Sequence, residues 1–329
     1  MKHITKPTEW VRKNGYHICF TLIVIVLAAM PLLLMNGAVK STTVLFLGKC
    51  ISFAIVAIGL DLIWGYTGIL SLGHGLYFCL GAYGMGMYLK LVQTNGQITD
   101  FMQVGGLTEL PLIWKPFLSP IGTFLMIVIV PIIVSGLIGY FIFKNRVKGV
   151  YFSIISQALT WAAYSIFIAL SPYTNGDVGI NQIQSVLGSL RGADHQGNLI
   201  VLFYIALAVL AVIYIVSAYL VHSKFGKILV AIRDGENRTY FSGYRVSNYK
   251  NFVYVLSAVF AAIAGALFVN FNGSITPTQM SITYSITMVI WVAIGGRGTL
   301  IGAVIGAFLI NLCEYNLSSG SMAESWQYI

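Results

Sequence analysis

Charged side chains are scarce in this sequence. Asp, Glu, Lys and Arg make up 9% of its 329 residues, and only 10 residues are acidic, whereas an ordinary soluble domain carries about 25% charged residues. Hydrophobic residues make up 57%, and the mean hydropathy is +0.83. A soluble globule of this size could not cover its surface with so few polar groups. The composition therefore predicts a polytopic membrane protein.

Familiar catalytic and ligand-binding motifs are also missing. The chain has no GxxxxGK[ST] loop, which excludes ATP binding by that route, and no HExxH or GxSxG motif. Its cysteines form no CxxC or Cys/His cluster with metal-ligand spacing, and we expect them to pack as small apolar side chains. The sequence therefore predicts neither an enzyme nor a bound cofactor.

Long apolar runs are abundant, and a membrane-spanning helix needs about 20 mostly apolar residues. Runs without Asp, Glu, Lys or Arg lie at 18–35, 120–143, 149–171, 199–221 and 251–271. Shorter or glycine-interrupted candidates lie at 45–64, 71–89, 282–296 and 299–317. Because these runs are continuously apolar rather than alternating, they predict helices and not a barrel.

The expected fold is an all-α membrane bundle of about eight or nine spans. It consists of a polar cytoplasmic lead at 1–17, a transmembrane domain at 18–317 and a short end at 318–329. With the N-terminus in the cytoplasm, successive crossings place most of the 19 basic residues on that side, as the positive-inside rule expects. Topology thus accounts for the net charge of +9, and no nucleic-acid partner is predicted.

A few polar residues interrupt the apolar runs and are candidates for a translocation path. Asp61 is costly in a membrane helix, and it either caps the 65–68 turn at the membrane boundary or lines a pore. His74, with Ser71 nearby, is either a packed histidine or part of a polar route. Gln157 and Thr160 lie one turn apart and form either interhelical hydrogen bonds or the wall of such a route.

Glycines accompany these residues. One cluster predicts an irregular backbone at the membrane face, which is tolerated only where protein or a water-filled cavity satisfies its polar groups. Its members are Gly65, Gly68, Gly73 and Gly75. Further on, Gly298, Gly302 and Gly306 recur every fourth position. This GxxxG spacing lets membrane helices approach closely, either within one subunit, which we favour, or between two.

The longest polar segment on the predicted cytoplasmic side is 222–250. Its apolar residues recur at the spacing of a short amphipathic helix or helix pair. Two interpretations remain open. The segment is either a solvated or interfacial element at the cytoplasmic face, or a docking element for a cytoplasmic protein.

Three stretches resemble a known family. GLDLIWGYTGILSLGHGLYFCLGAY resembles the signature of the permeases of branched-chain amino acid ABC importers, in which a GYTG-like turn precedes SLGH and GAY. AIRDGENRTYFSGYRVSNYKNFVYVLSAVFAAIAGALF resembles their cytoplasmic coupling segment and the helix after it, and VAIGGRGTLIGAVIGA resembles their C-terminal glycine turn. LDLIWGYTG, SLGHG, GMGMYL and GVYFSIISQALTWA look most like the urea-importer subfamily.

The resemblance implies that 222–250 docks on an ATPase. The residues expected at this contact are Ala231, Ile232, Arg233, Glu236, Gly243 and Tyr244. It also implies a second homologous permease, two ABC ATPase subunits and an extracytoplasmic solute-binding protein as partners, in the lipid bilayer of a bacterial cytoplasmic membrane. Such permeases usually continue with a further hydrophobic helix after this point. This sequence stops at SWQYI, so we expect the chain to lack that helix.

Several functions are compatible with these features. One is an importer permease for urea, a neutral solute that needs no charged anchor. Another is import of branched-chain amino acids or short amides, although a zwitterion would be expected to meet buried charges, which are few. A stand-alone urea or amide channel would need no coupling segment, so 222–250 counts against it. A membrane scaffold without transport activity is a further alternative.

Overall fold

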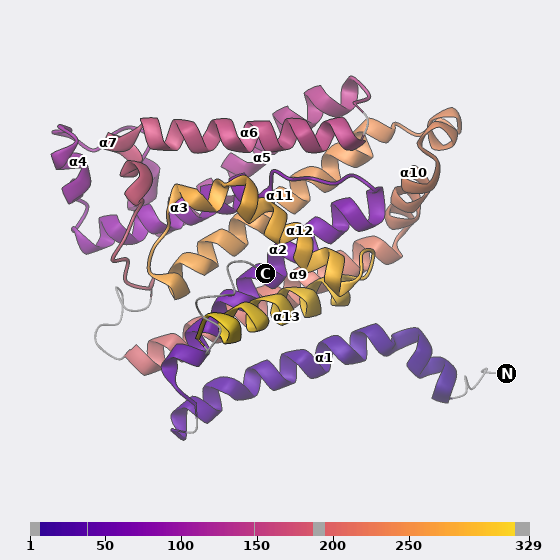
Figure 1. The fold of residues 1–329 in the computed structure, drawn as a ribbon, viewed down its shortest axis with the longest axis horizontal. Coiled ribbons are helices and arrows are strands. Elements are labelled where there is room, and N and C mark those ends of the chain that lie inside the picture. The colour runs from indigo at the N-terminus through magenta and orange to yellow at the C-terminus, as the bar shows by residue number, and fades with distance from the viewer. Residues whose placement is uncertain (1–6, 38, 148, 187–194, 320–329) are drawn as a thin grey trace.

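The computed structural model describes residues 7–37, 39–147, 149–186 and 195–319 (Figure 1). In these ranges the regular structure is helical, apart from an isolated antiparallel bridge between Ile180 and Ile275. Seven described helices are long and apolar enough to cross a membrane. They are α1 (Pro7–Met35), α2 (Ser41–Thr67), α5 (Pro120–Lys144), α6 (Gly149–Ala169), α9 (His195–His222), α11 (Val246–Asn272) and α13 (Leu300–Ser319).

Two further helices, α3 (His74–Gln93) and α12 (Ile282–Gly295), lie where the sequence predicts glycine-interrupted or short spans. The all-α polytopic bundle is therefore confirmed. Shorter elements connect the spans: α4 (Asp100–Val104), η1 (Lys115–Leu118), α7 (Ser171–Thr174), η2 (Gly176–Val178), α10 (Lys224–Phe241) and η3 (Pro277–Met280).

The N-terminal helix is longer than its apolar run. It begins at Pro7, inside the segment 1–17 that the sequence predicts as a polar lead. Proline is well tolerated in the first turn of a helix, where its missing N–H is not needed. Residues 1–6 of the predicted lead and residues 320–329 of the predicted end at 318–329 lie outside the described residues.

The centre of the bundle is formed by α2, α3 and α11, and α1 and α6 lie at opposite edges (Figure 1). Most of α2 and α11 is buried, whereas α5 and α6 are largely exposed. Cys50 and Cys79 are buried as predicted, but Cys19 and Cys313 are exposed. The outer face of a membrane helix needs no protein cover, so an apolar run does not imply burial within the chain.

Glycine allows α3 and α11 to touch through their backbones. A Cβ atom added to Gly81 would lie 2.0 Å from the Ala262 carbonyl oxygen, and one added to Gly265 would lie 1.9 Å from the Phe78 carbonyl oxygen. No side chain fits in such gaps. Close backbone approach of this kind is the way small residues pack membrane helices.

The helices of the α12–α13 hairpin also pack closely through glycines. A Cβ atom on Gly302 would lie 2.1 Å from the Gly295 carbonyl oxygen, and one on Gly306 would lie 2.0 Å from the Trp291 carbonyl oxygen. Gly302 and Gly306 thus pack α13 against α12 within one chain. Gly298, the first glycine of the predicted pattern, lies in the turn before α13 with φ +81°.

Candidate translocation path and coupling segment

The chain leaves helical geometry between α2 and α3. Gly68 ends α2 in a left-handed conformation, with φ +77°, and its N–H donates to the Trp64 carbonyl. Residues 69–73 follow without helix, and α3 starts at His74. The predicted irregular backbone is therefore confirmed at 68–73, although Gly65 and Gly75 lie inside the flanking helices.

This irregular segment is hydrogen-bonded to α6. The Ser153 hydroxyl donates to the Leu70 carbonyl at 2.6 Å, and the Leu72 N–H donates to the Ser156 hydroxyl at 3.1 Å. Two polar side chains of α6 thus supply partners that a helix would otherwise provide. They also fix the position of the segment that carries Ser71.

His74 is only 1% exposed and both of its ring nitrogens have partners. Nδ1 lies 3.0 Å from the Ser71 hydroxyl, and Nε2 lies 2.6 Å from the Ser257 hydroxyl, which itself donates to the Gly59 carbonyl. Since Ser257 gives its hydrogen to Gly59, the network assigns Nε2 as the donor and Nδ1 as the acceptor. His74 is then a neutral side chain that joins Ser71 to α2 and α11.

Gln157 and Thr160 occupy different environments. Thr160 is fully buried, and its hydroxyl donates to the Ser156 carbonyl of its own helix at 2.9 Å. Its oxygen would lie 3.3 Å from a Cβ atom on Gly73. Gln157 is only partly buried. Of this pair, Gln157 is therefore the more accessible.

We expect cysteine labelling to separate the two positions. In a background where exposed Cys19 and Cys313 are replaced by Ala, Gln157→Cys should react with a small hydrophilic thiol reagent, because reactivity needs access. Thr160→Cys should stay protected. Equal labelling of both would put Thr160 on an aqueous route, and protection of both in every nucleotide state would assign the pair to packing.

Asp61 is fully buried near the C-terminal end of α2. Its Oδ1 accepts a hydrogen bond of 2.6 Å from the Gly298 N–H in the α12–α13 turn, and its Oδ2 has no partner among the described residues. The carboxylate therefore binds a turn far along the chain and makes no hydrogen bond to the 65–68 turn. This contact joins two parts of the bundle.

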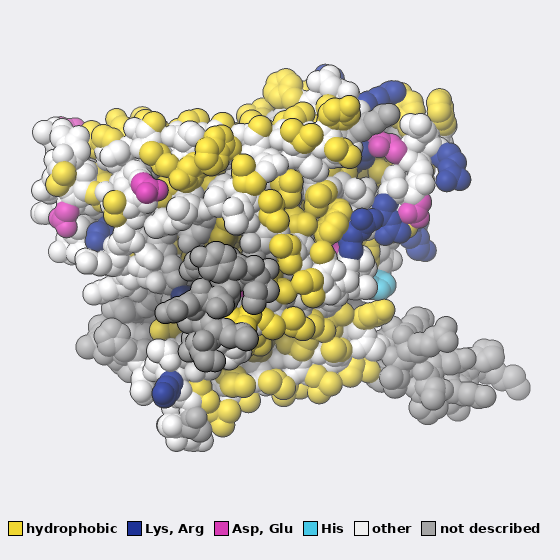
Figure 2. All heavy atoms as spheres, in the orientation of Figure 1, with side chains coloured by type: hydrophobic (Ala, Val, Ile, Leu, Met, Phe, Trp, Pro, Cys, Tyr) yellow, Lys and Arg dark blue, Asp and Glu magenta, His cyan; other side chains and the backbone are white. Residues whose placement is uncertain are grey.

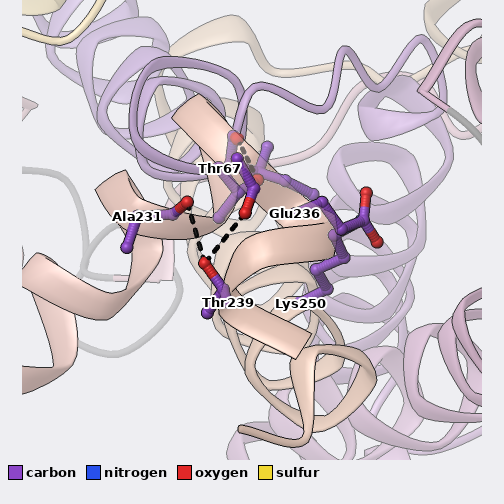
Figure 3. Close-up of polar contacts among 7 residues, drawn as sticks. Thr67, Ala231, Glu236, Thr239 and Lys250 are labelled. Atoms are coloured by element: carbon purple, nitrogen blue, oxygen red, sulfur yellow. Dashed lines mark hydrogen bonds and ion pairs between the residues drawn. The ribbon is translucent and has the colours of Figure 1, made fainter. Parts of the chain in front are cut away.

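The 222–250 segment folds as a broken helix. Within α10, Gly235 has non-helical dihedral angles that divide the helix in two. The Thr239 hydroxyl donates to the Ala231 carbonyl at 3.0 Å and to the Gly235 carbonyl at 3.1 Å, and so closes the break (Figure 3). Lys250 at the start of α11 pairs with Glu236 at 2.5 Å. The sequence predicts a short amphipathic helix or a helix pair here, and the structure shows one helix divided by a kink at Gly235.

The residues expected at the ATPase contact are not all on the surface. Ala231, Arg233, Glu236, Gly243 and Tyr244 are exposed. Ile232 is buried beneath them. The Arg233 guanidinium points back to the bundle, where Nη1 donates to the Gly65 carbonyl at 2.9 Å. Gly243 has φ +88° and no atom near its missing side chain.

An exposed aromatic group follows the break. Its members are Tyr240, Phe241 and Tyr244, and we name it the aromatic tip; Phe241 is 85% exposed. Tyr240 and Phe241 are absent from the set predicted from sequence, although an adjacent Tyr-Phe pair in a polar segment is a signal for them. Figure 2 shows Lys and Arg side chains gathered at this end of the molecule, beside a hydrophobic flank.

Apolar spans around a tightly packed glycine-rich centre, with a polar broken helix at one end, indicate a multi-pass membrane protein. Residues 42–329 match the family described as the branched-chain amino acid transport system / permease component. The chain belongs to this family.

Individual relatives are distant. The chain is 22% identical over 308 residues to the high-affinity branched-chain amino acid transport system permease protein LivM of Salmonella typhimurium, covering 88% of this chain and 65% of that protein. It is 24% identical over 282 residues to a probable LivM of Methanocaldococcus jannaschii, covering 80% of each. It is 28% identical over 175 residues to the galactose/methyl galactoside import permease MglC of Escherichia coli, covering 50% of this chain and 49% of that one. No solved structure matches the chain significantly.

Proposed function

We propose that this protein is a permease subunit of an ATP-binding cassette importer and that its solute is urea. The observation that carries the first part is α10, a broken helix whose aromatic tip is exposed on a chain without a nucleotide-binding loop. An aromatic group of this kind suits a protein interface. ATP hydrolysis would then belong to a partner that grips α10.

Urea is supported by the scarcity of buried charge. Among the described residues, the buried carboxylate and ammonium groups are those of Asp61 and Lys250. Asp61 already binds the Gly298 N–H, and Lys250 is paired with Glu236. Ser71 and Gln157 are neutral hydroxyl and amide groups, which suit a neutral solute. The competing proposal is import of branched-chain amino acids. It is supported by the similar LivM proteins, whose names describe branched-chain amino acid transport.

The proposed assembly contains a second homologous permease, two ABC ATPase subunits and an extracytoplasmic solute-binding protein. The protein would lie in a bacterial cytoplasmic membrane with its N-terminus and α10 on the cytoplasmic side, because the basic residues of 222–250 then obey the positive-inside rule. A stand-alone channel is the alternative of a different class, and the exposed α10 counts against it.

We expect uptake in living cells to identify the solute. Deletion of this permease should reduce accumulation of labelled urea to background and leave labelled leucine uptake unchanged, and re-expression should restore urea uptake. Loss of leucine uptake with intact urea uptake would assign the amino acid instead. Downhill urea flux through the purified chain alone would indicate a channel.

A further inference from the structure

Three parts of the chain that are distant in sequence meet at one place in the structure. They are the C-terminal turns of α2, the turn at 296–299 between α12 and α13, and the first half of α10. Their contacts are polar and are made largely to backbone groups of glycines. We call this meeting point the cytoplasmic joint, in keeping with the proposed orientation.

The α12–α13 turn is held on both sides of Gly298. Its N–H donates to Asp61 at 2.6 Å, and its carbonyl accepts a hydrogen bond of 3.0 Å from the Tyr66 hydroxyl. A Cβ atom on Gly65 would lie 2.7 Å from the Gly298 nitrogen, so the two backbones are in contact. Two hydrogen bonds and direct backbone contact thus hold the end of α2 against this turn.

Arg233 connects α10 to the same place. Its Nη1 donates to the Gly65 carbonyl at 2.9 Å, and its Nε donates to neighbouring Asp234 at 3.0 Å. A Cβ atom on Gly68 would lie 3.0 Å from Arg233 Cγ, so the aliphatic part of the arginine covers the start of the irregular segment. A cation is also favoured at the carbonyl end of a helix.

The contact of Arg233 with Gly65 and Gly68 lies next to the segment that carries the candidate path residue Ser71. Gly68 is followed within a few residues by Ser71, whose hydroxyl contacts His74. A displacement of Arg233 therefore acts at the end of α2 and on the segment of the candidate path. A cavity of about 180 Å³ lies beside the turn and is lined by residues that include Tyr66 and Gly298.

We propose that Arg233, Asp61 and Tyr66 are positioning residues of a joint that transmits movement of α10 to α2 and to the α12–α13 turn. This inference rests on the proposed function, because it takes α10 as the element that an ATPase moves. Asp61 and Tyr66 join the turn to α2, and Arg233 joins α10 to α2 at Gly65. None of the three needs to touch solute or nucleotide.

The test uses the complete importer reconstituted in liposomes, with three readouts: ATPase binding, ATP hydrolysis, and urea moved per ATP hydrolysed. Arg233→Met keeps the aliphatic stem but loses the hydrogen bond to Gly65. It should still bind the ATPase and hydrolyse ATP, while urea moved per ATP falls about tenfold, the effect of losing one charge-assisted hydrogen bond. Arg233→Lys, which retains a donor, should recover part of the loss.

Two further variants make the result specific. Tyr66→Phe removes only the hydroxyl that binds Gly298 and should also lower urea moved per ATP. Lys227→Met, the loss of another exposed cation on α10, should leave the ratio unchanged. Normal coupling in both Arg233→Met and Tyr66→Phe would overturn the joint. Loss of ATPase binding in Arg233→Met would assign Arg233 to the docking surface instead.

The proposed function fails in a different way. If the unaltered chain binds no ATPase, both the function and the joint are overturned. If it binds the ATPase and transports leucine but no urea, the solute is wrong, and the joint is tested with leucine moved per ATP. If Arg233→Met does not fold, Tyr66→Phe decides alone, with normal coupling counting against the joint and reduced coupling supporting it.

Discussion

Replacing Phe241 with Asp should abolish binding of the partner ATPase. Phe241 is 85% exposed on the aromatic tip, and buried aromatic anchors dominate the energetics of protein interfaces, at about 2 kcal/mol or more each. That loss alone weakens binding roughly thirtyfold. An aspartate would also carry a charge into the contact and leave it without a partner. We expect no complex when the purified permease is titrated with the ATPase and assayed by co-purification.

The matched control is Leu112→Asp. Leu112 is also an exposed apolar residue, at 80%, and it lies in the connection between α4 and η1. Figure 1 places α4 and α10 at opposite ends of the molecule. Leu112→Asp should bind the ATPase as the unaltered chain does. Normal binding by Phe241→Asp would remove the aromatic tip from the proposed docking surface.

Hydropathy predicts the spans well and their ends poorly. The run 120–143 agrees with α5 (Pro120–Lys144) to within a residue. In contrast, α11 begins at Val246, ahead of the apolar run that starts at 251. The reason is physical: apolar residues report which part of a helix can lie in lipid, whereas the helix itself continues into polar sequence until its backbone is capped or broken.

The candidate site could be predicted only in part. The residue types at Asp61, Arg233 and Gly298 were visible in the sequence, but their contacts are not local. Arg233 binds Gly65, 168 residues away, and Gly298 binds Asp61, 237 residues away. No local pattern reports such pairings. Gly298 illustrates the difficulty, because its spacing fits GxxxG although its backbone forms a turn. Spacing counts positions and does not tell whether a glycine is there for close packing or for a positive φ.

Local signals were sufficient where the contact partners were close in the sequence. The glycine cluster at 65–75 predicted the broken backbone, and the apolar spacing in 222–250 predicted a short helix or helix pair. His74 needed the fold, since its second partner is Ser257 on α11. The sequence left open whether His74 is a path residue or a packed histidine. In the structure it is a neutral side chain with both ring nitrogens bonded.

A single methyl group at the centre of the bundle should have the largest effect on stability. In Gly265→Ala the new Cβ would lie 1.9 Å from the Phe78 carbonyl oxygen, and a backbone atom cannot rotate away as a side chain can. The backbones of α3 and α11 would have to separate, and overpacking of this kind costs about 3 kcal/mol. We expect the thermal unfolding midpoint of the purified chain in detergent to fall by roughly 5–10 °C.

Gly136→Ala in α5 is the matched control, because it makes the same chemical change in another membrane helix. The nearest atom to its added Cβ would be Val255 Cγ2 at 3.9 Å, an ordinary contact distance. Alanine is favoured over glycine in a helix by up to about 1 kcal/mol, so this variant should unfold at the same temperature or slightly above. Equal midpoints for the two variants would mean that α3 and α11 do not cross through their backbones. Since neither glycine lies on α10 or in the cytoplasmic joint, this pair tests the fold independently of any transport function.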